Sequence, residues 1–101
     1  MDLVARTKLE IFVEAHAVDE IERMLKRFGF KGCSVFAGVE GAGSHGAWRQ
    51  TGVEEAGVRL VVTIGAESAA QAALVWLENY FAAYPGVVAM SEVRVLRAER
   101  F

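Results

Sequence analysis

The residues with the clearest capacity to bind an anion lie in a glycine-rich stretch, GVEGAGSHGAWRQTG, at positions 38–52 of the chain. Glycine lacks a Cβ, so backbone N–H groups in such a stretch can turn together towards a phosphate. A nearby arginine adds a planar group that donates two parallel hydrogen bonds to phosphate or bicarbonate. The candidates are Gly41, Gly43 and Ser44 for the phosphate cradle, and His45 and Arg49 for the added charge.

The same stretch also allows a plainer interpretation, a flexible connector, because GAGSHG is not a Walker A motif. Long loops in compact domains are usually functional or disordered, so we expect a sensor loop at about residues 41–56. Trp48 is a candidate contact for a partner protein, since exposed tryptophans often anchor interfaces. The alternative is that its ring packs back on the protein's own assembly.

The other reactive side chains do not suggest catalysis. The chain has one cysteine and two histidines, and no spacing assembles an acid, a base and a nucleophile. Nothing places a base beside Cys33, and a catalytic thiol needs one or another means of lowering its pKa. We interpret Cys33 as a strand residue and His16 as a turn or capping residue. We therefore expect a binding protein, neither an enzyme nor a metal protein.

Length and composition predict a single domain over residues 1–101. The chain is 53% hydrophobic and 24% charged, with a formal net charge of −2. This composition excludes intrinsic disorder, and the charge argues against a nucleic-acid binder. No apolar run approaches the ~18 residues of a membrane span, and one cysteine cannot form an internal disulfide. A cytoplasmic location is the expectation.

The hydrophobic pattern alternates between strand and helix periods along the whole chain. Leu9, Ile11 and Val13 recur every second residue, whereas Val18, Ile21, Met24, Leu25 and Phe28 mark one face of a helix that Gly29 ends. The expected strands are 8–14, 32–40, 57–65 and 87–97, and the expected helices are 18–28 and 67–83. This β-α-β, β-α-β order predicts an α+β fold, the ferredoxin-like βαββαβ sandwich.

Two of the expected strands are apolar on both faces. Leu60–Ile64 and Val87–Met90 do not alternate, although two helices can cover only one face of a four-stranded sheet. An exposed apolar sheet face implies a partner surface, so we expect a symmetric oligomer in which the sheets face inward. A monomer with an apolar surface is the alternative.

Three segments together resemble the PII signal-transduction proteins. VDEIERMLKRFGFKGCSV at 18–35 is similar to the family's helix and second strand, with Asp19, Glu20, Gly29, Gly32 and Ser34 at the matching positions. GVEGAG and RLVVTIGAES are similar to its mobile loop and third strand. YFAAYPGVVAMSEVRVL at 80–96 resembles the PII-like branch associated with carboxysomes and bicarbonate transporters. The resemblance covers residues 8 to about 98.

The sequence departs from the standard PII pattern at three places. No tyrosine lies between Gly38 and Gly57, only Tyr84-Pro85-Gly86 stands where a basic turn would precede the last strand, and Gly57 replaces a lysine. These departures favour the PII-like branch over nitrogen signalling with ATP and 2-oxoglutarate. The resemblance then implies a homotrimer that binds ADP or AMP in clefts between subunits, with bicarbonate as a candidate second ligand. Its loop would signal to a membrane transporter or another inorganic-carbon protein.

The resemblance also implies which further residues meet the nucleotide. Arginines at the end of the last strand would approach the phosphates, and Arg94 and Arg100 would share one face of that strand with Arg97 opposing them. A solvated basic tail is the alternative for these arginines, and a core hydroxyl is the alternative for Thr63. The implied nucleotide-binding residues beyond the loop are Gly32, Ser34, Arg59, Thr63, Arg97 and Arg100. A metal-handling trimer like the copper-tolerance CutA proteins is the competing function.

Overall fold

The computed structural model describes residues 1–44, 46–49 and 57–101. Within these ranges the chain forms two helices, six strands and two short 3-10 turns. In chain order they are β1 (Val4–Glu14), a 3-10 turn (Ala15–Ala17), α1 (Val18–Arg27), β2 (Ser34–Ala37), β3 (Glu40–Gly43), β4 (Gly46–Arg49), β5 (Val58–Gly65), α2 (Glu67–Phe81), β6 (Val87–Val95) and a terminal turn (Ala98–Arg100).

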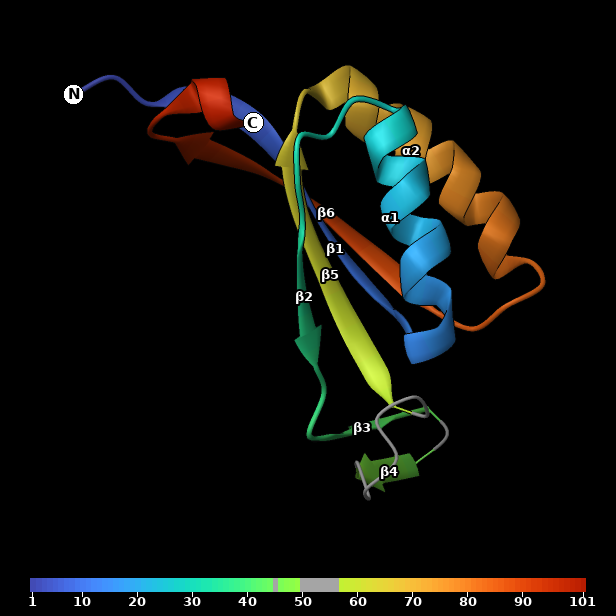
Figure 1. Cartoon of the computed structure of the whole chain (residues 1–101). Coiled ribbons are helices and arrows are strands. Elements are labelled where there is room, and N and C mark those ends of the chain that lie inside the picture. The colour runs from blue at the N-terminus through green and yellow to red at the C-terminus, as the bar shows by residue number, and fades with distance from the viewer. Residues whose placement is uncertain (45, 50–56) are drawn as a thin grey trace.

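Four of the strands form one antiparallel sheet in the order β2-β5-β1-β6, and both helices lie against the same face of it (Figure 1). The predicted ferredoxin-like α+β fold is confirmed. The core lies between the sheet and the helices, where β1 contributes every second side chain, as its period requires. Its fully buried members include Leu9 and Ile11 from β1, Val61 from β5, Ile21 and Leu25 from α1, and Leu77 from α2.

The helix boundaries follow local signals. α1 carries Asp19 and Glu20 in its first turn and Lys26 and Arg27 in its last, an arrangement that the helix dipole favours. Gly29 follows with φ of +101°, the left-handed conformation that commonly ends helices. α2 ends at Phe81, two residues earlier than predicted, and its C-terminal carbonyls accept hydrogen bonds from the next backbone N–H groups.

The face of the sheet away from the helices is open and carries a patch of apolar side chains towards its hairpin end, while Glu10 and Lys8 of β1 lie further along the same face. Phe12, Leu60 and Phe36 lie opposite one another across β1, β5 and β2, so their side chains share this face. The neighbouring residue Val62 lies on the same face, partly exposed, as does Val87 at the start of β6. The two-sided apolar character predicted for β5 and β6 is therefore present. We call this surface, with Phe12, Phe36, Leu60, Val62 and Val87, the open face.

The structure corrects two sequence-based expectations. The second strand does not run to residue 40: it ends at Ala37, and residues 40–43 and 46–49 pair as a separate two-stranded hairpin, β3–β4, where a continuous loop was expected from residue 41. The last strand ends at Val95, because the backbone turns at Arg97 with φ of +62°. Arg94 and Arg100 therefore do not share a strand face. No helix in the described part of the chain is long and apolar enough to cross a membrane.

Candidate functional site

The predicted ligand-binding residues lie at opposite ends of the sheet. Gly32 is held to β5 near its C-terminal end, where the Thr63 hydroxyl donates to the Gly32 carbonyl over 2.7 Å. Gly38 is held at the other end of β5, where its N–H donates to the Val58 carbonyl over 2.8 Å. Thr63 and Val58 are five residues apart, which is about 17 Å along a strand. Within a single chain, Gly32 and Ser34 therefore lie far from the glycine-rich hairpin (Figure 1).

At the hairpin end, Trp48 explains two of the glycines. Its indole packs on the backbone of β3, and a Cβ placed on Gly38 would lie 2.9 Å from the ring atom Cη2. The same ring covers Gly41, whereas a Cβ on Gly43 would meet nothing within 4 Å. Trp48 thus packs on its own hairpin while leaving 37% of its surface exposed. A contact between this exposed edge and a partner stays a prediction.

The hairpin's charged residues face each other. Arg49 Nη2 lies 3.5 Å from Glu40 Oε1 across the β3–β4 pair, and both side chains are exposed. An exposed pair of this kind is weak, so an anion could compete with Glu40 for the guanidinium. His45, the other predicted cation of this stretch, lies outside the described residues.

A hollow of about 480 Å³ lies at the hairpin end of the sheet, beside Ser44. It combines Ser44 with the start of β6 and the ends of β1 and β5, and we call it the hairpin hollow. Only Ser44 among its residues was predicted as a ligand. Its lining consists of Phe12, Val13, Glu14, Ser44, Val58, Pro85, Gly86 and Val87.

Gly86 in this hollow was not predicted as a site residue: it belongs to Tyr84-Pro85-Gly86, which stands where a basic turn would precede the last strand. Its φ is +151°, and a Cβ there would lie 2.4 Å from Cε1 of Phe81 and 2.8 Å from the Phe12 carbonyl oxygen. Only glycine fits this close approach. The Pro85-Gly86 pair was the available signal, since such a pair marks a tight backbone turn.

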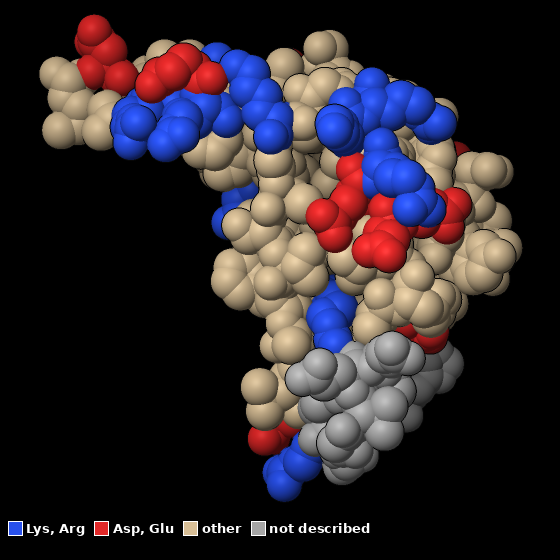
Figure 2. Space-filling model, viewed as in Figure 1, with Lys and Arg blue, Asp and Glu red and all other residues tan. Residues whose placement is uncertain are grey.

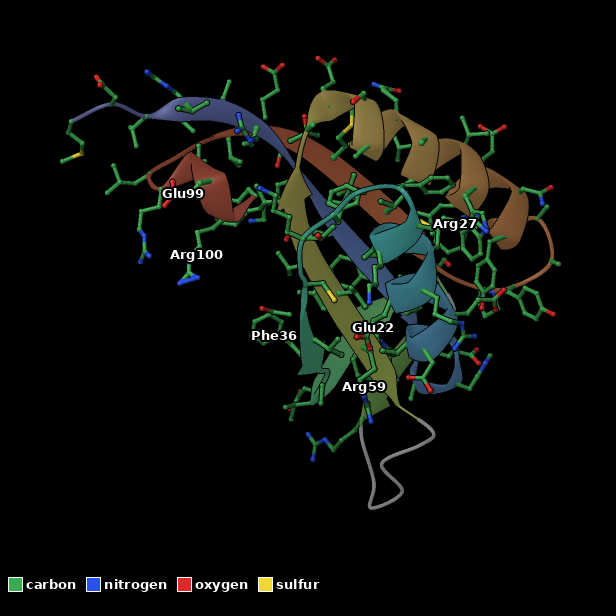
Figure 3. The ribbon with its side chains drawn as sticks, turned by 45° about the horizontal axis from the view of Figure 1, so that its top comes forward. Glu22, Arg27, Phe36, Arg59, Glu99 and Arg100 are labelled. Atoms are coloured by element: carbon green, nitrogen blue, oxygen red, sulfur yellow. The ribbon has the colours of Figure 1, made fainter. Side chains whose placement is uncertain are left out.

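Arg59 lies at the hairpin end of β5, opposite the buried Val13 on β1. One of its guanidinium nitrogens donates to the Val58 carbonyl over 3.2 Å. Figure 3 shows its side chain below α1, at the other end of the sheet from the terminal turn that carries Arg100. Within one chain, Arg59 therefore lies at the hairpin end of the sheet, away from the terminal arginines, and it does not line the hairpin hollow.

At the opposite end, the terminal turn brings its arginines beside the α1–β2 connection. Lys31 Nζ donates to the Glu99 carbonyl over 2.8 Å, so residues 68 positions apart meet there. Arg97 and Arg100 are exposed, and Arg97 Nε lies 3.8 Å from Glu99 Oε1. Figure 2 shows Lys and Arg gathered over the terminal turn and over the C-terminal end of α1. This end of the molecule therefore presents the positive charge that phosphate groups need.

The buried hydroxyl of Thr63 has a structural task at this end. Thr63 is only 2% exposed, and its hydroxyl donates its hydrogen bond to the Gly32 carbonyl. The structure thus favours the core-hydroxyl interpretation of Thr63, which acts by fixing Gly32. Ser34 is exposed at the first position of β2, opposite Val62. Its hydroxyl is accessible to a ligand on the open face.

Cys33 shows no sign of an activated thiol. Burial raises the pKa of Cys33 above its ordinary value, and the nearby Glu22 carboxylate raises it further. The thiol lies 3.9 Å from Glu22 Oε2 and can donate to it. A protonated thiol is a poor nucleophile, so the side chain does not fit a catalytic role. The strand assignment expected for it was wrong, because β2 begins one residue later, at Ser34.

The described residues also give no support to metal handling. Over residues 1–44, 46–49 and 57–101, no three His, Cys, Asp or Glu side chains gather into a group that could hold a metal ion. His16, in the turn before α1, pairs instead with Glu14 over 2.6 Å.

Comparisons with known proteins agree with this arrangement. Residues 6–100 match the model of the family described as nitrogen regulatory protein P-II. CPII, a nitrogen regulatory PII-like protein from Thiomonas intermedia K12 solved with ADP, AMP and bicarbonate, is 26% identical. It superposes with a TM-score of 0.90 over 99% of this chain and 96% of that one.

Two further solved structures extend the comparison. A PII-like signalling protein from Thermus thermophilus is 31% identical, with a TM-score of 0.81 over 100% of this chain and 99% of that one. GlnK from B. subtilis is 12% identical, with a TM-score of 0.63 over 89% of this chain and 86% of that one, which is a likeness of fold. No curated protein sequence matches the chain significantly.

Proposed function

The chain belongs to the P-II family of nitrogen regulatory proteins, and we propose that it is a PII-like regulator whose effector is an adenine nucleotide, ADP or AMP. The Thiomonas protein was solved with ADP, AMP and bicarbonate. A second structure of that protein holds ADP and bicarbonate, and a third holds ADP, AMP and acetate. Each ligand set in these relatives includes ADP, and each pairs the nucleotide with a small carboxylate-like anion.

One observation supports the proposal: the residues predicted to bind the ligand lie in two groups at opposite ends of the sheet. Gly32, Ser34 and the terminal arginines form one group, while Ser44, beside Gly86 in the hairpin hollow, belongs to the other. A second copy of the chain can bring its own hairpin hollow to the terminal arginines of the first. The nucleotide then binds between subunits of a homotrimer, and the open face buries its apolar side chains between the sheets.

The chemistry of the two groups suits a nucleotide. Arg97 and Arg100 can donate bidentate hydrogen bonds to phosphate oxygens. The Ser34 hydroxyl can donate to or accept from a ribose or a base. At the hairpin, Arg49 can exchange its exposed Glu40 partner for bicarbonate, with His45 as the candidate second donor. Occupation of the site then changes the population of hairpin conformations, which a partner protein reads.

The proposed output is control of inorganic-carbon uptake or metabolism. The bicarbonate found with the Thiomonas relatives supports this role, as does the likeness of residues 80–96 to the branch associated with bicarbonate transporters. The proposed partner is a membrane transporter or another inorganic-carbon protein, which would bring the trimer to the membrane. The exposed edge of Trp48 is the candidate contact for that partner.

Isothermal titration calorimetry with ATP, ADP, AMP and cyclic AMP, each with and without bicarbonate, tests the proposal directly. ADP or AMP should bind, and bicarbonate should strengthen the binding by the same factor by which the nucleotide strengthens bicarbonate binding. Arg100→Gln should weaken binding, whereas Arg94→Gln, an exposed strand arginine outside the terminal turn, should not. Absence of heat with all four nucleotides would overturn the proposal.

A further inference from the structure

The terminal turn has no means of holding its own position. It is a single 3-10 turn without a side-chain cap, and it is closed by two backbone hydrogen bonds, from Arg100 N–H to the Arg97 carbonyl and from Phe101 N–H to the Ala98 carbonyl. Isolated short helical segments are unstable because few hydrogen bonds offset the ordering of the backbone. The turn also begins after Arg97, which holds a left-handed conformation that disfavours residues with a Cβ. Contacts from elsewhere must fix it.

Two cationic side chains supply those contacts. Lys31 Nζ donates to the Glu99 carbonyl over 2.8 Å, a short, charge-assisted hydrogen bond. Arg6 Nη2 donates to the Ala98 carbonyl over 3.5 Å, which is at the long limit of a hydrogen bond. Lys31 therefore makes the stronger of the two attachments between the terminal turn and the body of the protein.

Lys31 is itself fixed by its neighbour in the chain. The Gly32 carbonyl accepts the hydroxyl hydrogen bond of the buried Thr63 on β5. A continuous path of contacts thus runs from β5 through Gly32 and Lys31 to Glu99 and the terminal turn. This path joins Gly32, which is followed by Ser34, to the terminal turn with Arg97 and Arg100. Figure 3 shows Glu99 and Arg100 on that turn.

We infer that Lys31 is a positioning residue for nucleotide binding: it sets the terminal turn, with Arg97 and Arg100, at a fixed place relative to Gly32 and Ser34. The inference rests on the proposed function and adds to it a residue that acts through the turn without being a phosphate ligand. Its ammonium group already donates to the Glu99 carbonyl. A phosphate bound to the same ammonium would have to compete with that carbonyl.

Lys31→Met tests the inference against a matched control, Lys26→Met. Both lysines are exposed and line the same hollow of about 570 Å³ at the end of α1, so both substitutions remove one positive charge from this end of the molecule. We expect Lys31→Met to weaken ADP binding about tenfold, from the loss of a charged hydrogen bond. Lys26→Met should change it by less than about twofold, because in the described part of the chain the Lys26 side chain makes no hydrogen bond or ion pair with the terminal turn, and an exposed charge by itself contributes little.

A conservative variant and a ligand-free measurement separate positioning from general stability. Lys31→Arg keeps a cationic donor and should restore most of the affinity. In protein without nucleotide, amide heteronuclear NOE values for residues 98–101 should fall in Lys31→Met and stay high in Lys26→Met and Lys31→Arg. The midpoint of urea unfolding should be the same in all of them, because the turn lies outside the core.

The outcomes divide cleanly. Equal loss of ADP affinity in Lys31→Met and Lys26→Met would reduce Lys31 to a surface charge and overturn the inference. Unchanged order of residues 98–101 in Lys31→Met would also overturn it, whatever happens to affinity. If the unmodified protein binds no ADP, the proposed function and the nucleotide role of Lys31 fail together. The NOE values would still show in that case whether Lys31 holds the turn.

Discussion

The indole of Trp48 lies so close to the backbone of Gly41 that a Cβ on Gly41 would stand 2.6 Å from Cζ2 of the ring. Trp48 is the only large apolar side chain among the described residues of the β3–β4 hairpin, so this contact is the apolar packing that the hairpin has. Without it, four-residue strands rich in glycine would have little to pack against. The contact therefore determines whether the first half of the glycine-rich stretch has a fixed fold.

Gly41→Ala should displace the Trp48 ring. In a Trp76→Phe background, where Trp48 is the sole tryptophan, its fluorescence should shift to longer wavelength and become easier to quench with acrylamide. The free energy of unfolding should change by less than about 0.5 kcal/mol, because the hairpin is separate from the core. Gly43→Ala is the control, since a Cβ there meets nothing within 4 Å. Identical spectra for the two variants would refute the packing role of Gly41.

Thr63→Val should destabilise the protein by about 1 kcal/mol, because it leaves the Gly32 carbonyl without its hydrogen bond while keeping the shape of the side chain. Urea unfolding measures this. Thr7→Val is the matched control: Thr7 is equally buried on the neighbouring strand, and the described part of the chain shows no side-chain hydrogen bond for it. That substitution should be neutral or stabilising. Equal losses in both variants would assign the effect to packing.

Sequence periodicity was sufficient to predict the main sheet and both helices because those elements are stabilised by regular burial. The alternation in β1 and the spacing of Ile21, Met24 and Leu25 in α1 are patterns that neighbouring residues carry locally. The hairpin was not predicted because its stabilising contact joins Trp48 to glycines. Glycine has no side chain, so it contributes nothing to a periodic pattern of hydrophobic residues. The glycine content alone favours a loop.

The end of β6 and the site were harder to predict for a related reason. The alternation VRVLR continues past Val95, and nothing near Arg97 in the sequence signals its left-handed turn. The terminal turn that follows is contacted at Glu99 by Lys31, 68 positions away, and Gly32 is contacted by Thr63, 31 positions away. Contacts over such separations leave no local pattern. The resemblance to a family implied Gly32 and the terminal arginines as candidates, which stay predictions, whereas Lys31 and Gly86 became candidates only from the structure.

The alkylation of Cys33 should be slow at neutral pH and should reach half its limiting rate at a pH above that of an ordinary thiol. Burial raises the pKa of Cys33, and the charge and the hydrogen bond of Glu22 raise it further. Glu22→Gln should therefore lower this midpoint in part, whereas Glu20→Gln, a carboxylate of the same helix that does not perturb the thiol, should leave it in place. Iodoacetamide kinetics across pH measure both; an unshifted midpoint in Glu22→Gln would contradict the assigned cause.

The same shift has a consequence for stability. Above the ordinary thiol pKa, the unfolded chain has released the Cys33 proton that the folded chain still retains. The unfolded state then binds fewer protons, so the free energy of unfolding falls as pH rises through this range. Cys33→Ala should flatten the fall, measured as urea midpoints between about pH 8 and pH 10. An equally steep fall in Cys33→Ala would assign the pH dependence to other groups.

Phe36→Glu should convert the proposed homotrimer into monomers. Phe36 is 54% exposed in the single chain and lies on the open face, opposite Leu60 (Figure 3). Burial of an unpaired carboxylate between apolar sheets is costly, whereas the isolated chain can leave it in water. Light scattering after gel filtration measures the mass. Val75→Glu is the control, because Val75 is 74% exposed on α2, which lies on the opposite side of the sheet.

The two variants also test where the nucleotide site forms. If the site needs the hairpin hollow of one subunit and the terminal arginines of another, Phe36→Glu should lose ADP binding together with trimer assembly. Val75→Glu should keep both. Raising the protein concentration should restore binding to Phe36→Glu in step with any trimer that re-forms, because assembly and ligand binding are then linked by mass action. A monomer that binds ADP as tightly as the unmodified protein would place the whole site within one chain, which the separation of Gly32 from the hairpin makes physically difficult.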